Sequence, residues 1–517
     1  MAGRAVAVRR WPGIGAAALV AALVLGTLLA VALRAEAGRG LGPSDWAAIR
    51  FTIVQSVLSA AISVALAIPV ARALSRRRFF GRRVLITLLG APFILPVIVA
   101  VLGLLAVFGR SGILNEALRW LGLPEVQVYG LHGVVLAHVF FNLPLATRLI
   151  LQGWQQVPAE RFRLAAQLGF GPREMWRVIE APMLSRVVPP AAAVIFAICL
   201  SSFAVALTLG GGPKATTVEL AIYQAFRFDF DLGRAALLSC VQLVLVGIAA
   251  LVALKLSGSE GFGAGLDRAV RRWDSAGLGR ISLDSAVIAL AALFLLLPMS
   301  LVVIDGLLGI TKMPAQVWKA AGVSVLVSLG STALMLALAL PIAIAAAGKS
   351  SWLEAVGLLG IASSPLVIGT GLFIVIYPIA DPFDFAFPVT ALVNAIMALP
   401  FALRILIGST RDVVQGYGRL SLSLGLTGRQ WLRIIYLPRM RAPLGFACGL
   451  TAALSMGDLG VIALFADPET ATLPLQMYRL MGSYRMEAAS GAALLLLVLS
   501  FGLFWLFDRG GRGHADS

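Results

Sequence analysis

Few residues of this 517-residue chain combine a reactive side chain with a setting that suggests chemistry, and Asp458 is the clearest of them. It lies in an apolar run, 443–465, that is long enough to cross a bilayer. A carboxylate in such a run is costly and is therefore a candidate functional residue. The competing interpretation is a structural role, in which Asp458 accepts hydrogen bonds from neighbouring backbone.

The other reactive side chains form no pattern typical of an enzyme. The three histidines (His132, His138 and His514) are too scattered for a metal site. The three cysteines (Cys199, Cys240 and Cys448) lie in apolar runs and are not spaced for metal binding or pairing. The run AIAAAGKS, 343–350, lacks the leading glycine of a phosphate loop. We therefore assign no catalytic residue, no metal and no cofactor, and expect a protein that is not an enzyme.

Composition places the chain in the membrane. It is 59% hydrophobic and only 13% charged, with a mean hydropathy of +0.92. Long continuous apolar runs favour helices over barrel strands, because backbone groups in lipid must be hydrogen-bonded within the segment. We predict an all-α polytopic membrane protein with about twelve spans, near 14–33, 51–72, 84–108, 131–151, 187–209, 235–256, 285–305, 321–347, 353–379, 389–408, 443–465 and 489–508.

The distribution of basic residues predicts the orientation. If the amino terminus is inside, the inside segments hold most of the 42 lysines and arginines, so both termini should be cytoplasmic. The net charge of +17 follows from this topology, and we expect no nucleic-acid partner. Arg4, Arg9 and Arg10 before the first apolar run resemble a signal sequence. That run is longer than a usual signal core, which favours a retained first helix.

A repeat organises the chain. RLAAQLGFGPREMWRVIEAP, 163–182, returns as RLSLSLGLTGRQWLRIIYLP, 419–438, each position 256 residues later. Further upstream, Pro96 corresponds to Pro365 and Ser56 to Ser328. We predict two tandem six-helix halves in the same orientation, 1–256 and 285–517. The Gly-rich, charged segment 257–284 between them is expected to be a cytoplasmic linker.

Each copy of the repeat predicts a helix-turn-helix elbow, at about 159–185 and 415–441. In the first copy, Pro158 and Glu160 open a helix and Gly169 ends it. Pro172 begins a second short helix, which Pro182 is expected to end before the next span. Apolar residues recur at helical spacing in both copies: Leu164, Leu168, Trp176 and Ile179, then Leu420, Leu424, Trp431 and Ile435. Such elbows suit a surface that takes force from a soluble partner, whereas a single copy would suit an amphipathic loop in the lipid interface.

The duplicated pattern resembles the EAA loop of ABC-importer permeases, whose cytoplasmic coupling helices dock into ATP-hydrolysing subunits. This sequence departs from the family pattern where Arg163 and Arg419 replace the usual Glu, and where Leu164 and Leu420 replace the first Ala. The resemblance implies two ATP-binding-cassette ATPase subunits as partners. The coupling residues it implies are Arg163, Ala165, Leu168, Gly169, Pro182, Arg419, Leu424, Gly425 and Pro438.

Segments 201–239 and 455–491 closely resemble the thiamine ABC-transporter permease family, and the similarity covers nearly the whole chain. It implies a fused type I permease in the bacterial inner membrane, importing thiamine or its phosphates from an extracytoplasmic binding protein. Within 201–239, Gly210, Gly211 and Gly212 should break the fifth helix in an outward loop, and Thr216 or Thr217 should cap the next helix.

Thiamine is cationic, so the resemblance makes Asp458 attractive as a residue on the substrate path. Its counterpart 256 positions earlier is Ser202, which leaves any such charge on one half only. The alternatives left open are a ferric-iron importer permease, which would share the fusion and the elbows, and an ion-gradient transporter, which would need no ATPase partner.

Overall fold

The computed structural model describes residues 10–36, 38, 40–90, 94–256, 277–347, 351–426, 428–466 and 471–512, which form helices and short connections without any strand. Eleven helical runs in this described part are long and apolar enough to cross a membrane. The predicted all-α polytopic membrane fold is confirmed.

The predicted first half covers residues 1–256. Its helices are α1 (Trp11–Arg34), α2 (Pro43–Arg76), α3 (Arg82–Leu88), α4 (Val97–Phe108), α5 (Ile113–Trp120), α6 (Leu131–Gln156), α7 (Ala159–Gln167), α8 (Pro172–Met175), the π-helical turn η3 (Trp176–Glu180), α9 (Ala181–Leu200), α10 (Phe203–Leu209), the 3₁₀ turn η4 (Pro213–Ala215), α11 (Val218–Arg227) and α12 (Leu232–Leu256).

The predicted second half covers residues 285–517, and α13 leads into it. Its helices are α13 (Leu278–Gly309), η6 (Ile310–Lys312), α14 (Ala315–Ala346), α15 (Ser351–Ala362), α16 (Pro365–Ile376), η7 (Pro382–Phe385), α17 (Ala386–Ser423), α18 (Gly428–Trp431), the π-helical turn η8 (Leu432–Tyr436), α19 (Leu437–Met456), α20 (Gly460–Phe465), α21 (Leu473–Gly482) and α22 (Met486–Arg512). Of the expected linker, residues 257–276 lie outside the described residues, and 278–284 are the first turns of α13.

Two predicted spans have boundaries that differ from the prediction. The segment expected as the ninth span, 353–379, is two helices, because Pro365 opens α16 and the Ser364 hydroxyl accepts a hydrogen bond from the Leu366 N–H at 3.2 Å. The third span, expected at 84–108, starts only at Val97, after the separate short helix α3.

The fifth and eleventh spans are broken at matching positions. In the first half, Ser201 and Ser202 separate α9 from α10, and in the second, Gly457, Asp458 and Leu459 separate α19 from α20. Asp458 is therefore at a helix break, where free backbone donors are available, and not in the middle of a continuous helix.

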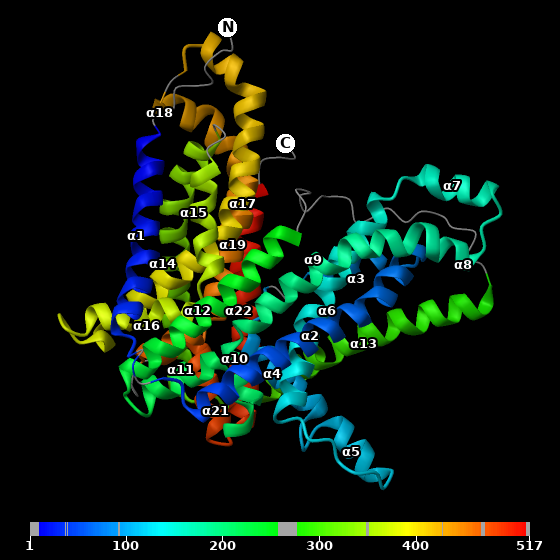
Figure 1. Ribbon diagram of the computed structural model, residues 1–517, viewed down its shortest axis with the longest axis horizontal. Helices are drawn as coiled ribbons and strands as arrows, with labels where there is room; N and C mark the ends of the chain where they lie inside the picture. Colours follow the sequence, from blue (N-terminus) through cyan, green and yellow to red (C-terminus); the bar gives the residue numbers. More distant parts are fainter. Residues whose placement is uncertain are drawn as a thin grey trace.

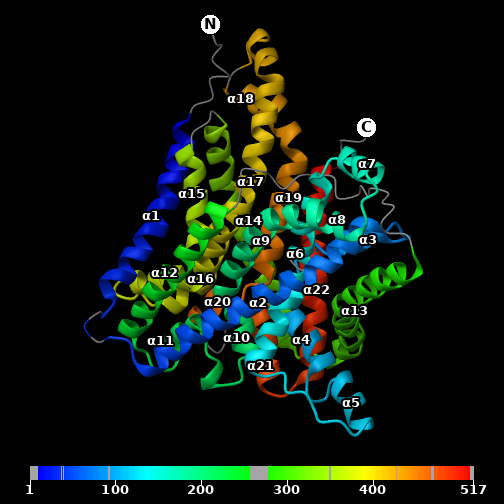
Figure 2. The same ribbon diagram turned by 45° about the vertical axis from the view of Figure 1, so that its right-hand side comes forward.

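The first helix of each half packs against the other half. Helix α1 lies along α14 and α16, and α13 lies along α4 and α2 as well as α22 of its own half. Small residues permit these crossings, since a Cβ on Gly13 would clash with the Pro341 carbonyl oxygen, and one on Gly103 would lie 2.6 Å from that of Pro298. The two halves are thus interlocked (Figures 1 and 2).

The helices diverge toward one end of the molecule as two arms. Helices α7 and α8 lie at the tip of one arm and α18 at the tip of the other, at the end where α1 begins (Figure 1). Helices α5, α11 and α21 lie at the opposite end, where the arms meet, and a second view shows the same arrangement (Figure 2).

Candidate functional site

The first elbow has the predicted helix, turn and second helix. Helix α7 begins after Pro158 and ends at Gln167, and Gly169 follows with a left-handed φ of 70°. That conformation lets the Phe170 N–H donate to the Ala165 carbonyl at 3.0 Å, which closes the helix end. Pro172 then occupies the first turn of α8, where its missing N–H has no intrahelical partner to lose.

The second elbow ends its first helix in the same way. Gly425 has a φ of 64°, and the Leu426 N–H donates to the Ser421 carbonyl at 2.9 Å. The helix that leads into it differs from the prediction of a separate short helix, because α17 runs unbroken from the membrane into the elbow. Val414 stands where the first half has Pro158, so nothing in this copy interrupts the helix.

The prediction that Pro182 ends a helix is wrong, and so is its equivalent at Pro438. The chain stays helical from Pro172 to Leu200, with Pro182 in the first turn of α9. A π-helical turn precedes it, in which the Ala181 N–H donates to the Trp176 carbonyl five residues back. This shifted bonding accommodates the proline without a break. The turn η8 does the same before Pro438.

Most of the predicted coupling residues lie on the surface. Those with exposed side chains or backbone are Arg163, Leu168, Gly169, Pro182, Arg419, Leu424, Gly425 and Pro438. Ala165 is instead buried, in a small core with Phe162 and Met175 that holds the two helices of the first elbow together. The exposed Leu164 and Leu168, with Leu420 and Leu424 in the second copy, give each elbow an uncovered apolar face.

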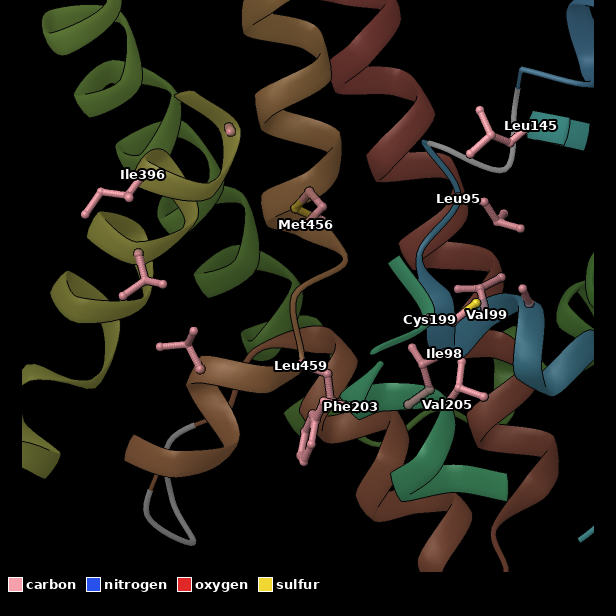
Figure 3. Close-up of a cluster of buried hydrophobic side chains, with 14 of the residues drawn as sticks. Leu95, Ile98, Val99, Leu145, Cys199, Phe203, Val205, Ile396, Met456 and Leu459 are labelled. Atoms are coloured by element: carbon pink, nitrogen blue, oxygen red, sulfur yellow. The ribbon is translucent and has the colours of Figure 1, made fainter. Parts of the chain in front are cut away.

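A cavity of about 330 Å³ lies where the two halves meet. Its walls come from the start of α4, from α6 and α11, from the start of α16, and from the breaks that follow α9 and α19. The break residues contact the opposite half, since a Cβ on Gly457 would lie 3.1 Å from Cα of Pro96 and one on Gly460 would lie 3.7 Å from Phe203. Figure 3 shows Phe203 and Leu459 pointing toward each other near this place.

Both predicted path residues, Ser202 and Asp458, line this one cavity. In the first half, the Ser202 hydroxyl lies 2.6 Å from His138 Nε2, and the Ser59 hydroxyl lies 3.2 Å from His138 Nδ1. In the second half, Asn394 occupies the position of His138 and donates to Ser455 at 3.1 Å. The cavity is therefore lined by the His138–Ser202 pair from the first half and by Asp458 from the second, whereas Asn394 and Ser455 are not among its lining residues.

Asp458 supports both interpretations offered for it. Its Oδ1 accepts a hydrogen bond from the Gly460 N–H at 3.3 Å, which is the structural role. Its buried Oδ2 accepts no hydrogen bond of good geometry from a described residue, although the Asn394 side chain and the Val461 and Ile462 N–H groups lie near the carboxylate, and the side chain lines the cavity. A buried carboxylate oxygen without a well-placed donor is unfavourable, so the site is suited to a cationic or hydrogen-bonding ligand.

The Gly-rich run has the predicted turn and the predicted threonine cap, but it does not end the fifth span. Gly211 and Gly212 have φ values of 72° and 127°, and the Thr217 hydroxyl accepts a hydrogen bond from the Leu220 N–H at 3.3 Å, capping α11. The fifth span had already ended ten residues earlier, at Leu200, so the glycines follow α10 instead.

Sequence reasoning missed four polar residues of the cavity: His138, Asn142, Ser201 and Glu219. Glu219 gives the first half a carboxylate too, so the expectation of a charge on one half only is wrong. Asn142 donates to Cys199 Sγ at 3.3 Å, and Glu219 accepts from Gln242 at 3.2 Å. The signal was present, because the 256-residue offset pairs His138 with Asn394, two polar residues in otherwise apolar spans.

Known proteins resemble the chain over its full length. No protein-family model matches it. The thiamine transport system permease protein ThiP of Salmonella typhimurium is 40% identical over 524 residues, covering 98% of this chain and 97% of the relative. The ThiP proteins of Brucella abortus and Escherichia coli are each 39% identical, and cover 97% and 96% of this chain and 95% and 96% of their own lengths.

A more distant relative matches about half of the chain. The molybdenum transport system permease protein ModB of Mycobacterium bovis is 30% identical over 233 residues, which is 44% of this chain and 86% of the relative. A separate permease of that size corresponds in length to one repeat. With whole-length identity near 40% and two elbow repeats, the chain belongs to the family of thiamine transport system permease proteins, the fused two-half permeases of the type I ABC importer class.

Proposed function

We propose that this chain is the membrane-spanning permease subunit of an ATP-driven importer for thiamine and its phosphates. The single observation that carries the proposal is the 40% identity to a thiamine permease over 98% of the chain. ATP hydrolysis takes place in separate ATP-binding-cassette subunits, and the permease itself is not an enzyme. It resides in the bacterial inner membrane with both termini in the cytoplasm.

The two elbows, 159–185 and 415–441, are the docking surfaces for two ATPase subunits. Their exposed leucine pairs and their place at the tips of the two arms support this assignment. An extracytoplasmic thiamine-binding protein docks at the opposite end, where α5, α11 and α21 lie. ATP and the loaded binding protein must each favour the outward-open state, since equal affinity for both states would shift nothing.

Within the membrane, the substrate passes the cavity between the halves, where Asp458 and Ser202 line the path. The Oδ2 of Asp458 supports this placement, because thiamine carries a positive charge that a buried carboxylate attracts. The two predicted halves, 1–256 and 285–517, each supply one wall of the cavity.

Uptake of labelled thiamine by cells that lack the protein tests the proposal, with and without its restoration. We expect restored uptake that collapses when ATP is depleted. Ferric iron is offered in a parallel sample. Movement of iron instead of thiamine would overturn the substrate, and thiamine uptake on an ion gradient alone would overturn the ATPase coupling.

A further inference from the structure

The first elbow is tied to the membrane helices by a buried ion cluster. Glu180, the last residue of η3, is fully buried, and its carboxylate oxygens lie 2.7 Å from Arg72 Nη2 and 3.4 Å from Arg76 Nη2. Both arginines belong to α2, and the Arg72 guanidinium also lies over the Trp176 ring at 5.3 Å. Loss of one partner from a buried ion pair leaves an uncompensated charge, so this contact strongly fixes η3 against α2.

Among the residues that the structure describes, the second elbow has no such cluster at the matching position. The residue 256 positions after Glu180 is Tyr436, whose hydroxyl lies 2.9 Å from that of Thr410 on α17 and whose ring stacks on Trp431 at 5.0 Å. The offset that relates Ser56 to Ser328 places Ile344 of α14 where α2 has Arg72. An uncharged contact to α17 thus replaces a charged contact to α2.

The two halves also differ in helix continuity. In the second half, one helix, α17, carries both Asn394 beside the cavity and Arg419 in the elbow. In the first half, the same path is interrupted at Pro158, which has an extended ψ of 139° and separates α6 from α7. The second elbow is thus joined to the region beside the cavity by one continuous helix, which contains Pro400, whereas the first elbow follows a break between α6 and α7.

Helix α2 offers the first elbow another route to the cavity. It has 34 residues, a length of about 50 Å at ~1.5 Å per residue. Beyond Arg72 and Arg76 it presents Ser59, which lies 3.2 Å from His138 Nδ1, and Gln55, which donates to the Cys199 carbonyl at 2.9 Å. One helix therefore joins the ion cluster to the His138–Ser202 pair.

We propose that Glu180, Arg72 and Arg76 are positioning residues that transmit movement of the first elbow through α2 to the cavity. In the first half these three residues provide the link from elbow to cavity that the continuous helix α17 provides in the second half. This inference rests on the proposed coupling role of the elbows. None of the three residues lines the cavity, and the Glu180 carboxylate is fully buried, whereas the Arg72 side chain is 29% exposed.

The test is the number of thiamine molecules imported per ATP hydrolysed, in proteoliposomes that hold the complete complex and the binding protein. We expect Glu180→Gln to lower this ratio by at least about fivefold while ATP hydrolysis continues, because a coupling energy of ~1–3 kcal/mol is lost. Glu487→Gln is the matched control, since it neutralises an exposed ion pair with Lys312 and should leave the ratio unchanged.

A second substitution separates transmission from simple packing. Pro158→Val copies Val414 of the second half and should join α6 to α7. When Pro158→Val is added to the Glu180→Gln protein, the number of thiamine molecules imported per ATP hydrolysed should rise part of the way back to the original value. If Glu180→Gln does not accumulate in the membrane, Arg72→Gln provides the same test, because that side chain is 29% exposed and its loss is better tolerated.

The outcomes distinguish this inference from the function on which it rests. A normal ratio in Glu180→Gln or Arg72→Gln, with transport still abolished by bulky residues at Gly169 and Gly425, would overturn the α2 route alone. Normal transport by that glycine variant as well would overturn the elbow assignment. If Glu180→Gln lowers the ratio of thiamine imported to ATP hydrolysed and Pro158→Val does not raise it again, Glu180 has a packing role only and the transmission role is rejected.

Discussion

At the scale of single residues, the two halves use the same positions for different chemistry. Positions 138 and 202 hold His and Ser, while their counterparts 394 and 458 hold Asn and Asp. Of these four positions only 458 holds a carboxylate, but the first half also lines the cavity with the carboxylate of Glu219. Carboxylates that can attract positive charge thus line the cavity from both halves, and the His138–Ser202 pair can exchange hydrogen bonds with neutral groups.

Asp458→Asn should therefore slow thiamine import. The change keeps the shape and the Gly460 contact but removes the charge, and a hydrogen bond to a charged group contributes ~1.5–3 kcal/mol, so uptake at low thiamine concentration should fall about tenfold or more. Initial uptake rates over a range of thiamine concentrations measure the effect. Asp305→Asn, an exposed carboxylate on α13, serves as the control. Equal rates for both variants would assign Asp458 a structural role only.

At the scale of elements, the elbows depend on two glycines in the left-handed region. Gly169 and Gly425 have φ values of 70° and 64°, and open space surrounds the position of a Cβ at each. Side-chain volume is therefore not the obstacle at either site. The obstacle is backbone conformation, since a residue with a Cβ pays roughly 1–2 kcal/mol to adopt it.

The double variant Gly169→Val and Gly425→Val should uncouple transport while the protein still inserts in the membrane. Strain at both turns redirects the helices that follow, and we expect uptake per ATP hydrolysed to fall about tenfold or more, in line with ~1–2 kcal/mol at each site. Gly322→Val is a suitable control, because Gly322 lies inside α14 with ordinary helical backbone and open space around it. Transport at the control level would contradict the assignment of the elbows.

At the scale of the whole molecule, helices that pack together do not all belong to the same sequence repeat. Helix α1 of the first half lies on α14 and α16, and α13 of the second half lies on α4 and α2. Arg77 at the end of α2 adds an ion pair to Asp284 of α13, with Nε and Oδ2 2.7 Å apart. The first helix of each half thus packs against the other half, and neither half alone buries all of its apolar surface.

Two fragments, 1–266 and 267–517, should assemble when they are expressed together. The exchanged helices create a large apolar interface between the halves, so the fragments should copurify in mild detergent and restore thiamine uptake. Either fragment alone should be degraded. Removing residues 1–36 from the first fragment deletes α1 and should sharply reduce recovery of the second. Equal recovery without α1 would show that the exchange contributes little to assembly.

The sequence by itself determined the membrane class, the duplication, the glycine-ended elbows and the candidacy of Asp458, because each depends on local composition or on spacing along the chain. It did not show that the chain stays helical through Pro182 and Pro438. A π-helical turn before each proline allows this, and no local sequence pattern reveals the shifted hydrogen bonds. Nor could the sequence place Asp458, Ser202 and His138 around one cavity, or bring Glu180 to Arg72 and Arg76 across more than one hundred residues. Only the tertiary structure decided these, because contacts between distant segments depend on how interlocked helices pack, and packing is a property of the assembled set rather than of any one stretch.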